Sequence, residues 1–334
     1  MSSFSDLVNC GNLAIADAAL KCQSVFETHE KAIVSISGGA DSDVMMDVCE
    51  RVRQVSPIAI TYLFQDTGME YEATRAHLDY LEDLYGVKIK RNLPDLTVPE
   101  TCRRYGQPFV SKMVSSVMGG LQRNGFEWED EPLDVLGRKY PKCKSYLKWW
   151  CNEYSTKMDN PRSIYHVRRN KWLKEFLIEN PPQFSISEKC CDRSKKTPSN
   201  RYVRLSNADV VLTGVRASER GARTIHNKCI IAGNDGPDKY RPLYWLNNDD
   251  REQYIDMFGI RNSDCYEVWG FTRTGCAGCP FNKDVFEELD IAERHEPKFV
   301  KAARVVFADS YEYTRQYREF RRFKESGGQV RLFT

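Results

Sequence analysis

Four of the twelve cysteines are grouped in a pattern that indicates metal chemistry. Cys190 and Cys191 are adjacent, and after 84 intervening residues Cys276 and Cys279 follow as Cys-x2-Cys. Four thiolates suit either a tetrahedral zinc ion or a [4Fe–4S] cluster. Adjacent cysteines bind one zinc ion awkwardly because their side chains diverge, whereas a cluster offers each thiolate its own iron. The spacing therefore favours a cluster over zinc, and a site without metal is the third alternative.

The other cysteines do not share this pattern. Because the N-terminal segment lacks a basic start followed by an apolar block, and no apolar run reaches the roughly 18 residues of a membrane span, we expect a cytoplasmic protein without membrane association. Disulfides are rare in that reducing compartment. Six cysteines are therefore expected to be small buried hydrophobic residues: Cys10, Cys22, Cys49, Cys102, Cys229 and Cys265. Cys143 and Cys151 lie in a basic, aromatic segment and stay unassigned.

The loop SISGGADS, residues 35–42, is the sharpest single motif. Two glycines allow a tight turn, and consecutive N–H groups at the start of the following helix favour an anion. The loop lacks the lysine of a Walker A sequence, so that class of nucleotide-binding protein does not fit. We expect its residues to bind phosphate groups: Ser35, Ser37, Gly38, Gly39, Asp41 and Ser42. The alternative is a plain glycine turn.

Two further segments carry polar residues where predicted strands end. Asp66, Thr67 and Gly68 follow the second predicted strand, where ligands bind in doubly wound sheets, and Glu70 suits ribose or a metal. Capping of the next helix is the alternative for Asp66. The second segment, after a later strand, contains phosphate-binding candidates: Gly214, Arg216, Arg220 and Arg223. A solvated helix face paired with Glu219 is the alternative there, and Arg273 precedes Cys276 closely enough to link a cluster to a nucleotide.

The elements that must position these residues alternate between strand and helix. Apolar, β-branched runs predict strands at 32–36, 58–64, 87–90 and 209–214, with helical spacing at 12–30, 43–52 and 72–84. This order predicts an α/β fold with a doubly wound parallel sheet. We expect one nucleotide-binding domain over residues 1–285, interrupted by a mostly helical insertion at about 103–180. Residues 286–334 form a C-terminal helical segment.

The overall composition neither indicates nor excludes nucleic acid. The formal net charge is +2, and 41% of the residues are hydrophobic. Residues 138–174 interleave cations with aromatic residues, among them Lys144, Lys148, Trp149 and Trp150. Such a pattern fits base stacking, and it fits equally well a solvated helix face over a small aromatic core.

Taken together, the motifs resemble those of the PP-loop ATP pyrophosphatase and PAPS (phosphoadenosine phosphosulfate) reductase superfamily. Ser-Gly-Gly-x-Asp-Ser resembles its pyrophosphate loop, and Asp66-Thr67-Gly68 resembles the segment after its second strand. The cysteine pattern is similar to that of assimilatory reductases and of phage and mobile-element members. In that family a lysine after the cysteine pair lies near cluster and substrate, which implies such a role for Lys195 or Lys196. The resemblance implies an adenine nucleotide alpha hydrolase-like fold.

The resemblance also implies an activity. The reductases end in a Glu-Cys-Gly-Leu-His tail, whereas no cysteine follows Cys279 here, and the loop keeps its full ATP-type form. We therefore expect cleavage of ATP to AMP and pyrophosphate with Mg²⁺, adenylating an acceptor in sulfur transfer or nucleic-acid sulfur modification. This resembles the ATP pyrophosphatase of DNA phosphorothioation systems. The catalytic candidates are Asp41, Ser42, Lys195 and Arg216.

Three kinds of partner and two alternative functions accompany this expectation. The partners are an adenine nucleotide, a nucleic acid, and a protein that donates sulfur or electrons. The first alternative is a sulfonucleotide reductase that takes an adenylyl sulfate (APS or PAPS) in place of ATP. The second is a regulatory partner that binds nucleotide and cluster without turnover.

Overall fold

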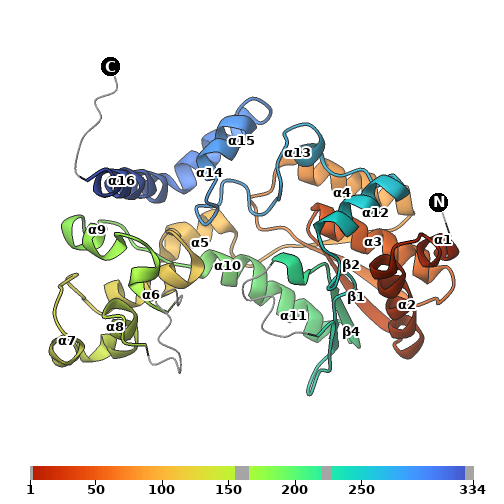
Figure 1. The fold of residues 1–334 in the computed structure, drawn as a ribbon, viewed down its shortest axis with the longest axis horizontal. Coiled ribbons are helices and arrows are strands. Elements are labelled where there is room, and N and C mark those ends of the chain that lie inside the picture. The colour runs from red at the N-terminus through yellow and green to blue at the C-terminus, as the bar shows by residue number, and fades with distance from the viewer. Residues whose placement is uncertain (1–2, 155–164, 220–227, 328–334) are drawn as a thin grey trace. The chain divides into compact units, whose positions relative to one another are not determined.

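The computed structural model describes residues 3–154, 165–219 and 228–327 of the chain (Figure 1). The chain divides into two compact units. Unit 1 comprises residues 1–95 and 194–277, and unit 2 comprises residues 96–193 and 278–334.

Unit 1 is built around a six-stranded sheet with the order β3-β2-β1-β4-β6-β5. Each neighbouring pair is parallel except β5 and β6, which pair antiparallel at one edge. The strands are β1 (Lys31–Ile36), β2 (Ala59–Gln65), β3 (Ile89–Asn92), β4 (Val210–Thr213), β5 (Ile230–Ile231) and β6 (Asp238–Tyr240). The predicted doubly wound parallel sheet is confirmed, although the short edge strands β5 and β6 were not predicted.

Helices cover both faces of this sheet. Figure 1 shows α2 (Leu13–Thr28) and α3 (Ala40–Arg53) on one side of β1 and β4, and α11 (Thr197–Leu205) on the other. Apolar residues of α2, α3 and the strands form a single core, in which Val34, Val44 and Leu212 are fully buried. The remaining helices of unit 1 are α1 (Phe4–Val8), α4 (Glu72–Tyr85), α12 (Asn248–Phe258) and α13 (Asp264–Glu267). The side chain of Asn247 caps α12 by accepting from the Asp250 N–H.

Unit 2 is helical and has an aromatic core. Phe109 contacts Tyr313 with 4.8 Å between ring centroids, and Phe176 contacts the same ring at 4.9 Å. Its helices before residue 194 are α5 (Val98–Tyr105), α6 (Lys112–Arg123), α7 (Leu133–Lys139), α8 (Lys144–Trp150), α9 (Leu173–Glu179) and α10 (Lys189–Cys191). Those after residue 277 are α14 (Val285–Ala292), α15 (Pro297–Val306) and α16 (Ala308–Glu325).

The division of the chain differs from the expected boundaries. We expected a break at residue 285, with the insertion at 103–180 inside the nucleotide-binding domain. Instead the insertion and the C-terminal helices share one core, because Tyr313 and Tyr317 of α16 pack with Phe109 and Phe176. Periodicity marks these helices along the sequence, but it does not tell which apolar faces meet.

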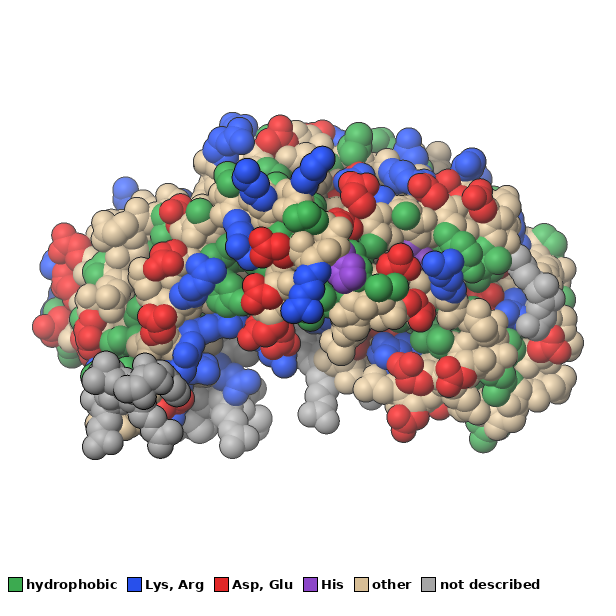
Figure 2. All heavy atoms as spheres, turned by 90° about the horizontal axis from the view of Figure 1, so that it is seen from above, with side chains coloured by type: hydrophobic (Ala, Val, Ile, Leu, Met, Phe, Trp, Pro, Cys, Tyr) green, Lys and Arg blue, Asp and Glu red, His purple; other side chains and the backbone are tan. Residues whose placement is uncertain are grey.

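The surface charges and the length of the apolar helices complete the description of the fold. On the face drawn in Figure 2, acidic and basic side chains are interspersed, in agreement with the small net charge of +2. None of the helices that the structure describes is long and apolar enough to cross a membrane.

Candidate functional site

The loop between β1 and α3 is shaped by close contacts around two glycines. Gly38 has φ of +68°, which disfavours other residues, and a Cβ there would come within 2.7 Å of the Thr74 Cγ2 atom. A Cβ at Gly39 would lie 2.9 Å from the Tyr266 hydroxyl. The residues around the loop therefore leave no room for a side chain at either position.

Ser42 holds this loop together from inside. Its hydroxyl donates to the Gly39 carbonyl at 2.8 Å and accepts from the N–H of Gly39 at 3.2 Å and of Ser37 at 3.3 Å. The side chain is buried. Ser42 thus fixes the loop geometry, whereas Ser37 is exposed and has its hydroxyl available at the mouth of the loop.

Gly214 allows a second segment to approach the loop. This residue follows β4, and a Cβ there would come within 2.9 Å of the backbone oxygen of Asp41. β4 is the direct neighbour of β1, so the carboxyl ends of both strands meet at this point. Gly214, which the sequence predicts as a phosphate-binding residue, therefore lies directly against the loop.

Asp41 lies between two arginines. The Arg216 Nε atom donates to Asp41 Oδ1 at 2.8 Å, and Arg251 Nη1 lies 3.4 Å from the same oxygen. Arg216 is buried, and its Nη1 atom also donates to Asn248 Oδ1 at 3.0 Å. One carboxylate therefore fixes two guanidinium groups beside the loop.

These arginines line a cavity of about 640 Å³ over the loop. A third guanidinium group, that of Arg273, lines it as well, and the carboxylates in its lining are Asp41 and Glu219. The excess of positive over negative side chains, together with the amino end of α3, suits a ligand with several negative charges.

The Tyr266 hydroxyl closes the loop from the segment that leads to the cysteines. It accepts from the Thr274 N–H at 2.9 Å and lies 3.1 Å from the Thr274 hydroxyl. Burial raises the pKa of this phenol, although the hydrogen bonds from Thr274 and from the Ala40 backbone oppose the rise. Tyr266 is therefore a neutral hydroxyl at the start of α3.

The turn after β2 contains two coupled carboxyl groups. Burial raises the pKa of Asp66, but hydrogen bonds with Glu70 and Arg75 outweigh it and hold that pKa below its usual value. Arg75 contacts both Asp66 oxygens, at 2.8 and 3.1 Å. Burial raises the pKa of Glu70 to about 7, despite a hydrogen bond from Thr67. Asp66 is thus the ionised member of the pair, and Glu70 is the member that carries a proton near neutral pH.

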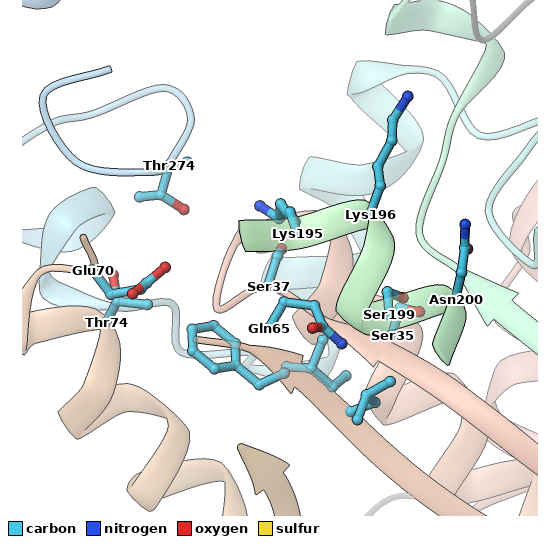
Figure 3. A pocket seen from close by; sticks show the side chains of 14 residues that line it. Ser35, Ser37, Gln65, Glu70, Thr74, Lys195, Lys196, Ser199, Asn200 and Thr274 are labelled. Atoms are coloured by element: carbon cyan, nitrogen blue, oxygen red, sulfur yellow. The ribbon is translucent and has the colours of Figure 1, made fainter. Parts of the chain in front are cut away.

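Glu70 faces a second cavity of about 290 Å³ next to the loop cavity. Figure 3 shows Glu70 and Thr274 on one side of it, with Ser199 and Asn200 on the other. Its lining combines apolar atoms of Ile36, Leu63 and Phe64 with polar side chains, which is typical of a site for a nucleoside. Lys195 and Lys196 line it too, and the Lys196 side chain extends away from the strands in Figure 3.

The cysteines of the predicted metal site fall into both units. Cys276 belongs to unit 1, where its Sγ atom accepts a hydrogen bond from the Thr67 hydroxyl at 3.5 Å. Cys190, Cys191 and Cys279 belong to unit 2. Within the described ranges no group of three or more cysteine, histidine or acidic side chains is arranged to hold a metal ion.

Cys102 lies beside the predicted ligands of unit 2. A hydrogen bond with Cys102 raises the pKa of the Cys190 thiol, and burial adds to the rise. A hydrogen bond with Cys191 lowers the pKa of the same thiol, and the charge of Cys279 raises it. Cys102 is buried as predicted, but it is next to the cysteine pair, and its position 88 residues earlier in the sequence gave no signal of this.

The two adjacent tryptophans of the basic segment lie inside unit 2. Trp149 and Trp150 are almost fully buried in its core, whereas Lys144 and Lys148 are exposed. Of the two interpretations of this segment, the burial matches a solvated helix face over an aromatic core, because buried indoles cannot stack on bases.

Several residues of the site were not found by sequence reasoning. Arg251 and Asn248 come from the first turn of α12, and Tyr266 comes from α13. Each lies far along the sequence from the loop, outside any recognisable motif. Arg220 and Arg223, which we expected to bind phosphate, lie outside the described residues.

A sequence model of the phosphoadenosine phosphosulfate reductase domain matches residues 31–115 and 147–282. A search of curated proteins found no match.

Two solved structures are similar to the chain at 13% sequence identity. One is phosphoadenylyl-sulfate (PAPS) reductase from Candida auris in a phosphate complex, with a TM-score of 0.40 over 81% of this chain and 93% of that chain. The other is the U34-tRNA thiolase NcsA from Methanococcus maripaludis with its [4Fe-4S] cluster. Its TM-score is 0.39, over 92% of this chain and 79% of that chain.

Proposed function

The chain belongs to the phosphoadenosine phosphosulfate reductase domain family, and from this premise we propose that it cleaves ATP to AMP and pyrophosphate to adenylate an acceptor. The adenylated acceptor then takes part in sulfur transfer or in sulfur modification of nucleic acid. ATP binds with its nucleoside in the cavity beside Glu70 and its phosphates on the loop.

The cavity over the loop is the observation that carries this proposal. Arg216, Arg251 and Arg273 bring three guanidinium groups to it. A leaving pyrophosphate carries several negative charges, whereas the sulfate of an adenylyl sulfate carries one. The three guanidinium groups outnumber the two carboxylates of this lining, so the cavity beside the helix start favours a polyphosphate over a sulfate.

The proposed reaction uses the side chains for positioning and for charge. An acceptor oxygen attacks the α-phosphorus, the bond to the bridging oxygen of the β-phosphate breaks, and that oxygen leaves on pyrophosphate with the electron pair. The acceptor proton passes to solvent. Arg216 and Arg251 stabilise charge on the departing group, Lys195 that on the α-phosphate, and Ser42 keeps the loop in shape. Mg²⁺, when bound, neutralises phosphate charge, and Asp41 is the loop carboxylate suited to hold it.

We include an iron–sulfur cluster in this proposal because the chain offers the donor atoms that such a cluster needs. Cys190, Cys191, Cys276 and Cys279 supply four thiols, the donor type that iron–sulfur clusters require. Anaerobically prepared protein should contain about four irons per chain. Cys190→Ser should lose most of this iron, whereas Cys143→Ser, which changes a buried thiol elsewhere in unit 2, should keep it. Wild-type protein with one zinc and no iron would contradict the cluster.

A sulfonucleotide reductase is the second candidate function, and the family match supports it. Such an enzyme would bind an adenylyl sulfate through the same two cavities and release sulfite when supplied with a thiol. A partner protein that binds nucleotide without turnover would use the cavities in the same way. Product analysis separates these three functions.

The test is product analysis on one preparation with its metal content measured. We expect AMP and pyrophosphate from ATP, and negligible sulfite from adenylyl sulfates with a protein thiol present. Arg216→Ala should abolish pyrophosphate release, whereas Lys90→Ala, which removes an exposed cation of β3, should not. Strong sulfite release would favour the reductase. ATP binding without any product would favour the partner protein, and ADP with phosphate would contradict the proposed reaction.

A further inference from the structure

Unit 1 contains a third cavity, on the side of the sheet that α11 covers. Its volume is about 920 Å³, larger than that of the nucleoside cavity or the loop cavity. Residues of α11, of β4 and β6, and of the exposed stretch 232–234 line it. Neither the nucleotide nor the pyrophosphate of the proposed function accounts for this space.

The charged residues that line this cavity are all basic. Arg204 comes from α11, Lys239 from β6, and Arg241 follows β6, while the described residues of the lining include no Asp or Glu. The Arg241 guanidinium lies 5.4 Å from the centre of the Tyr244 ring. Arg204 and Lys239 form no ion pair with any residue in the described ranges. Because like charges repel, three cations around one hollow favour an anionic occupant.

The third cavity meets the other two at Ser35. This residue, near the end of β1, lines all three, and Ser199 and Asn200 line both the nucleoside cavity and the third cavity. Adenylate transfer requires three groups around one phosphorus atom, namely the nucleoside, the leaving pyrophosphate and the acceptor. Two of the cavities suit the first two groups, which leaves the third for the acceptor.

We propose that the cavity around Arg204, Lys239 and Arg241 binds the acceptor, and that the acceptor is a nucleic-acid strand held through its phosphates. This inference rests on the proposed ATP cleavage and names its substrate class. Arg204 belongs to α11, whereas Lys239 and Arg241 lie in β6 and just after it, so the cations are spread over two elements and suit successive phosphates along a strand. The absence of aromatic residues from the described lining indicates binding through the backbone, without base stacking.

The experiment measures the affinity of full-length protein for a fluorescent single-stranded oligonucleotide, with a non-hydrolysable ATP analogue present. We compare wild type with the Arg204→Gln/Lys239→Gln double variant. Removing two phosphate contacts should weaken binding about tenfold and reduce the slope of log affinity against log salt by about two. Lys90→Gln, an exposed cation outside the described cavities, should change neither quantity. ATP affinity, measured by calorimetry, should remain within about twofold in all variants.

Three results would overturn the inference. One is a wild-type chain that binds no oligonucleotide, and another is equal loss of affinity in the double variant and in Lys90→Gln. A double variant that binds the oligonucleotide normally but loses affinity for inorganic phosphate would also overturn it, because the cavity would then serve a small anion. These results are distinct from failure of the proposed function, which would appear as absent pyrophosphate in the wild type.

Discussion

The two units of the chain differ in where their ion pairs lie, buried in one and exposed in the other. Unit 1 buries Asp47 together with Arg51 at 2.6 Å, and it buries Arg216 against the partly exposed Asp41 at 2.8 Å. Unit 2 buries aromatic rings and leaves ion pairs on its surface, such as Arg138 with Asp134, whose side chains are 77% and 72% exposed. A surface pair contributes little to stability, whereas separating a buried pair costs several kcal/mol.

This difference indicates where the chemistry lies. Desolvated charges that converge on a cavity act strongly on a ligand, and in unit 1 they surround the loop between β1 and α3. In unit 2 the indoles of Trp149 and Trp150 stabilise the core. Substitutions in one unit should therefore change ligand binding, and substitutions in the other should change stability.

The largest effect is expected for Trp150→Ala. The Trp150 ring is fully buried, and its Nε1 atom donates to the Glu129 carbonyl at 2.8 Å. Its loss should lower the free energy of unfolding of unit 2 by about 3–5 kcal/mol. Thermal denaturation measures this effect, with Trp245→Ala, at an indole that is 46% exposed, as the control. ATP affinity at a temperature where the variant stays folded should be unchanged. A large loss of affinity would contradict the view that unit 2 contributes to stability and not to ligand binding.

The second largest effect is expected for Gly214→Val. The new side chain would collide with the Asp41 backbone and displace the loop. We expect ATP affinity to fall by at least about 100-fold, which corresponds to about 2.7 kcal/mol. Calorimetric titration is the measurement. The control is Gly137→Ala in α7 of unit 2, where an added Cβ meets no atom within 4 Å. Unchanged affinity of Gly214→Val would argue that the loop does not bind the nucleotide.

A smaller effect is expected for Arg251→Gln. Arg251 shares Asp41 with Arg216 but is the more exposed of the two, so its contribution to phosphate binding is screened more strongly. Pyrophosphate affinity should fall about tenfold, or about 1.4 kcal/mol. Arg251→Lys should restore part of it, because the charge is kept while the planar fork is lost. Full affinity in Arg251→Gln would remove this residue from the site.

The smallest effect is a pH dependence caused by Glu70. Its raised pKa, about 7, means that the carboxyl group is neutral at pH 6 and ionised at pH 8. Ionisation adds a negative charge beside an anionic nucleotide, so ATP affinity should be highest below pH 7 and fall as the pH rises through 7. Asp66 stays ionised and Arg75 stays protonated over this range, so neither produces the change.

We expect a change of about threefold between pH 6 and 8, on the scale of a screened interaction between charges in one cavity. Glu70→Gln should remove it, because an amide does not titrate in this range. The measurement is ATP titration at several pH values and constant ionic strength. An equal pH dependence in Glu70→Gln would assign the effect to another group.

Sequence reasoning predicted the sheet well because its signals are local. Short β-branched runs predicted β1, β2, β3 and β4 to within about two residues, and the glycine motif predicted a tight loop directly after β1. The short strands β5 and β6 were missed, because runs of two and three residues carry no periodicity. The alternation of strands and helices was sufficient for the fold class.

The candidate site could be predicted only where its residues form motifs. Gly38, Gly39 and Asp41 lie within four consecutive residues, so their type and order predict a phosphate loop. Arg251 is 210 residues from Asp41, and no pattern in its own helix distinguishes it from a surface arginine. Cys102 likewise resembles a buried structural cysteine until α5 and α10 bring it beside Cys190.

By itself, the sequence determined the alternation of elements and the glycine loop between β1 and α3, because each depends on residues close along the chain. Only the tertiary structure decided that Arg216 and Arg251 both contact Asp41, and that the Ser42 hydroxyl bonds to the loop backbone. It also decided that α16 packs in one core with the helices of the inserted segment. These outcomes depend on which buried faces meet, and distant segments meet according to shape and total buried area. A charged side chain becomes part of a site when such packing removes it from water and places an oppositely charged group beside it.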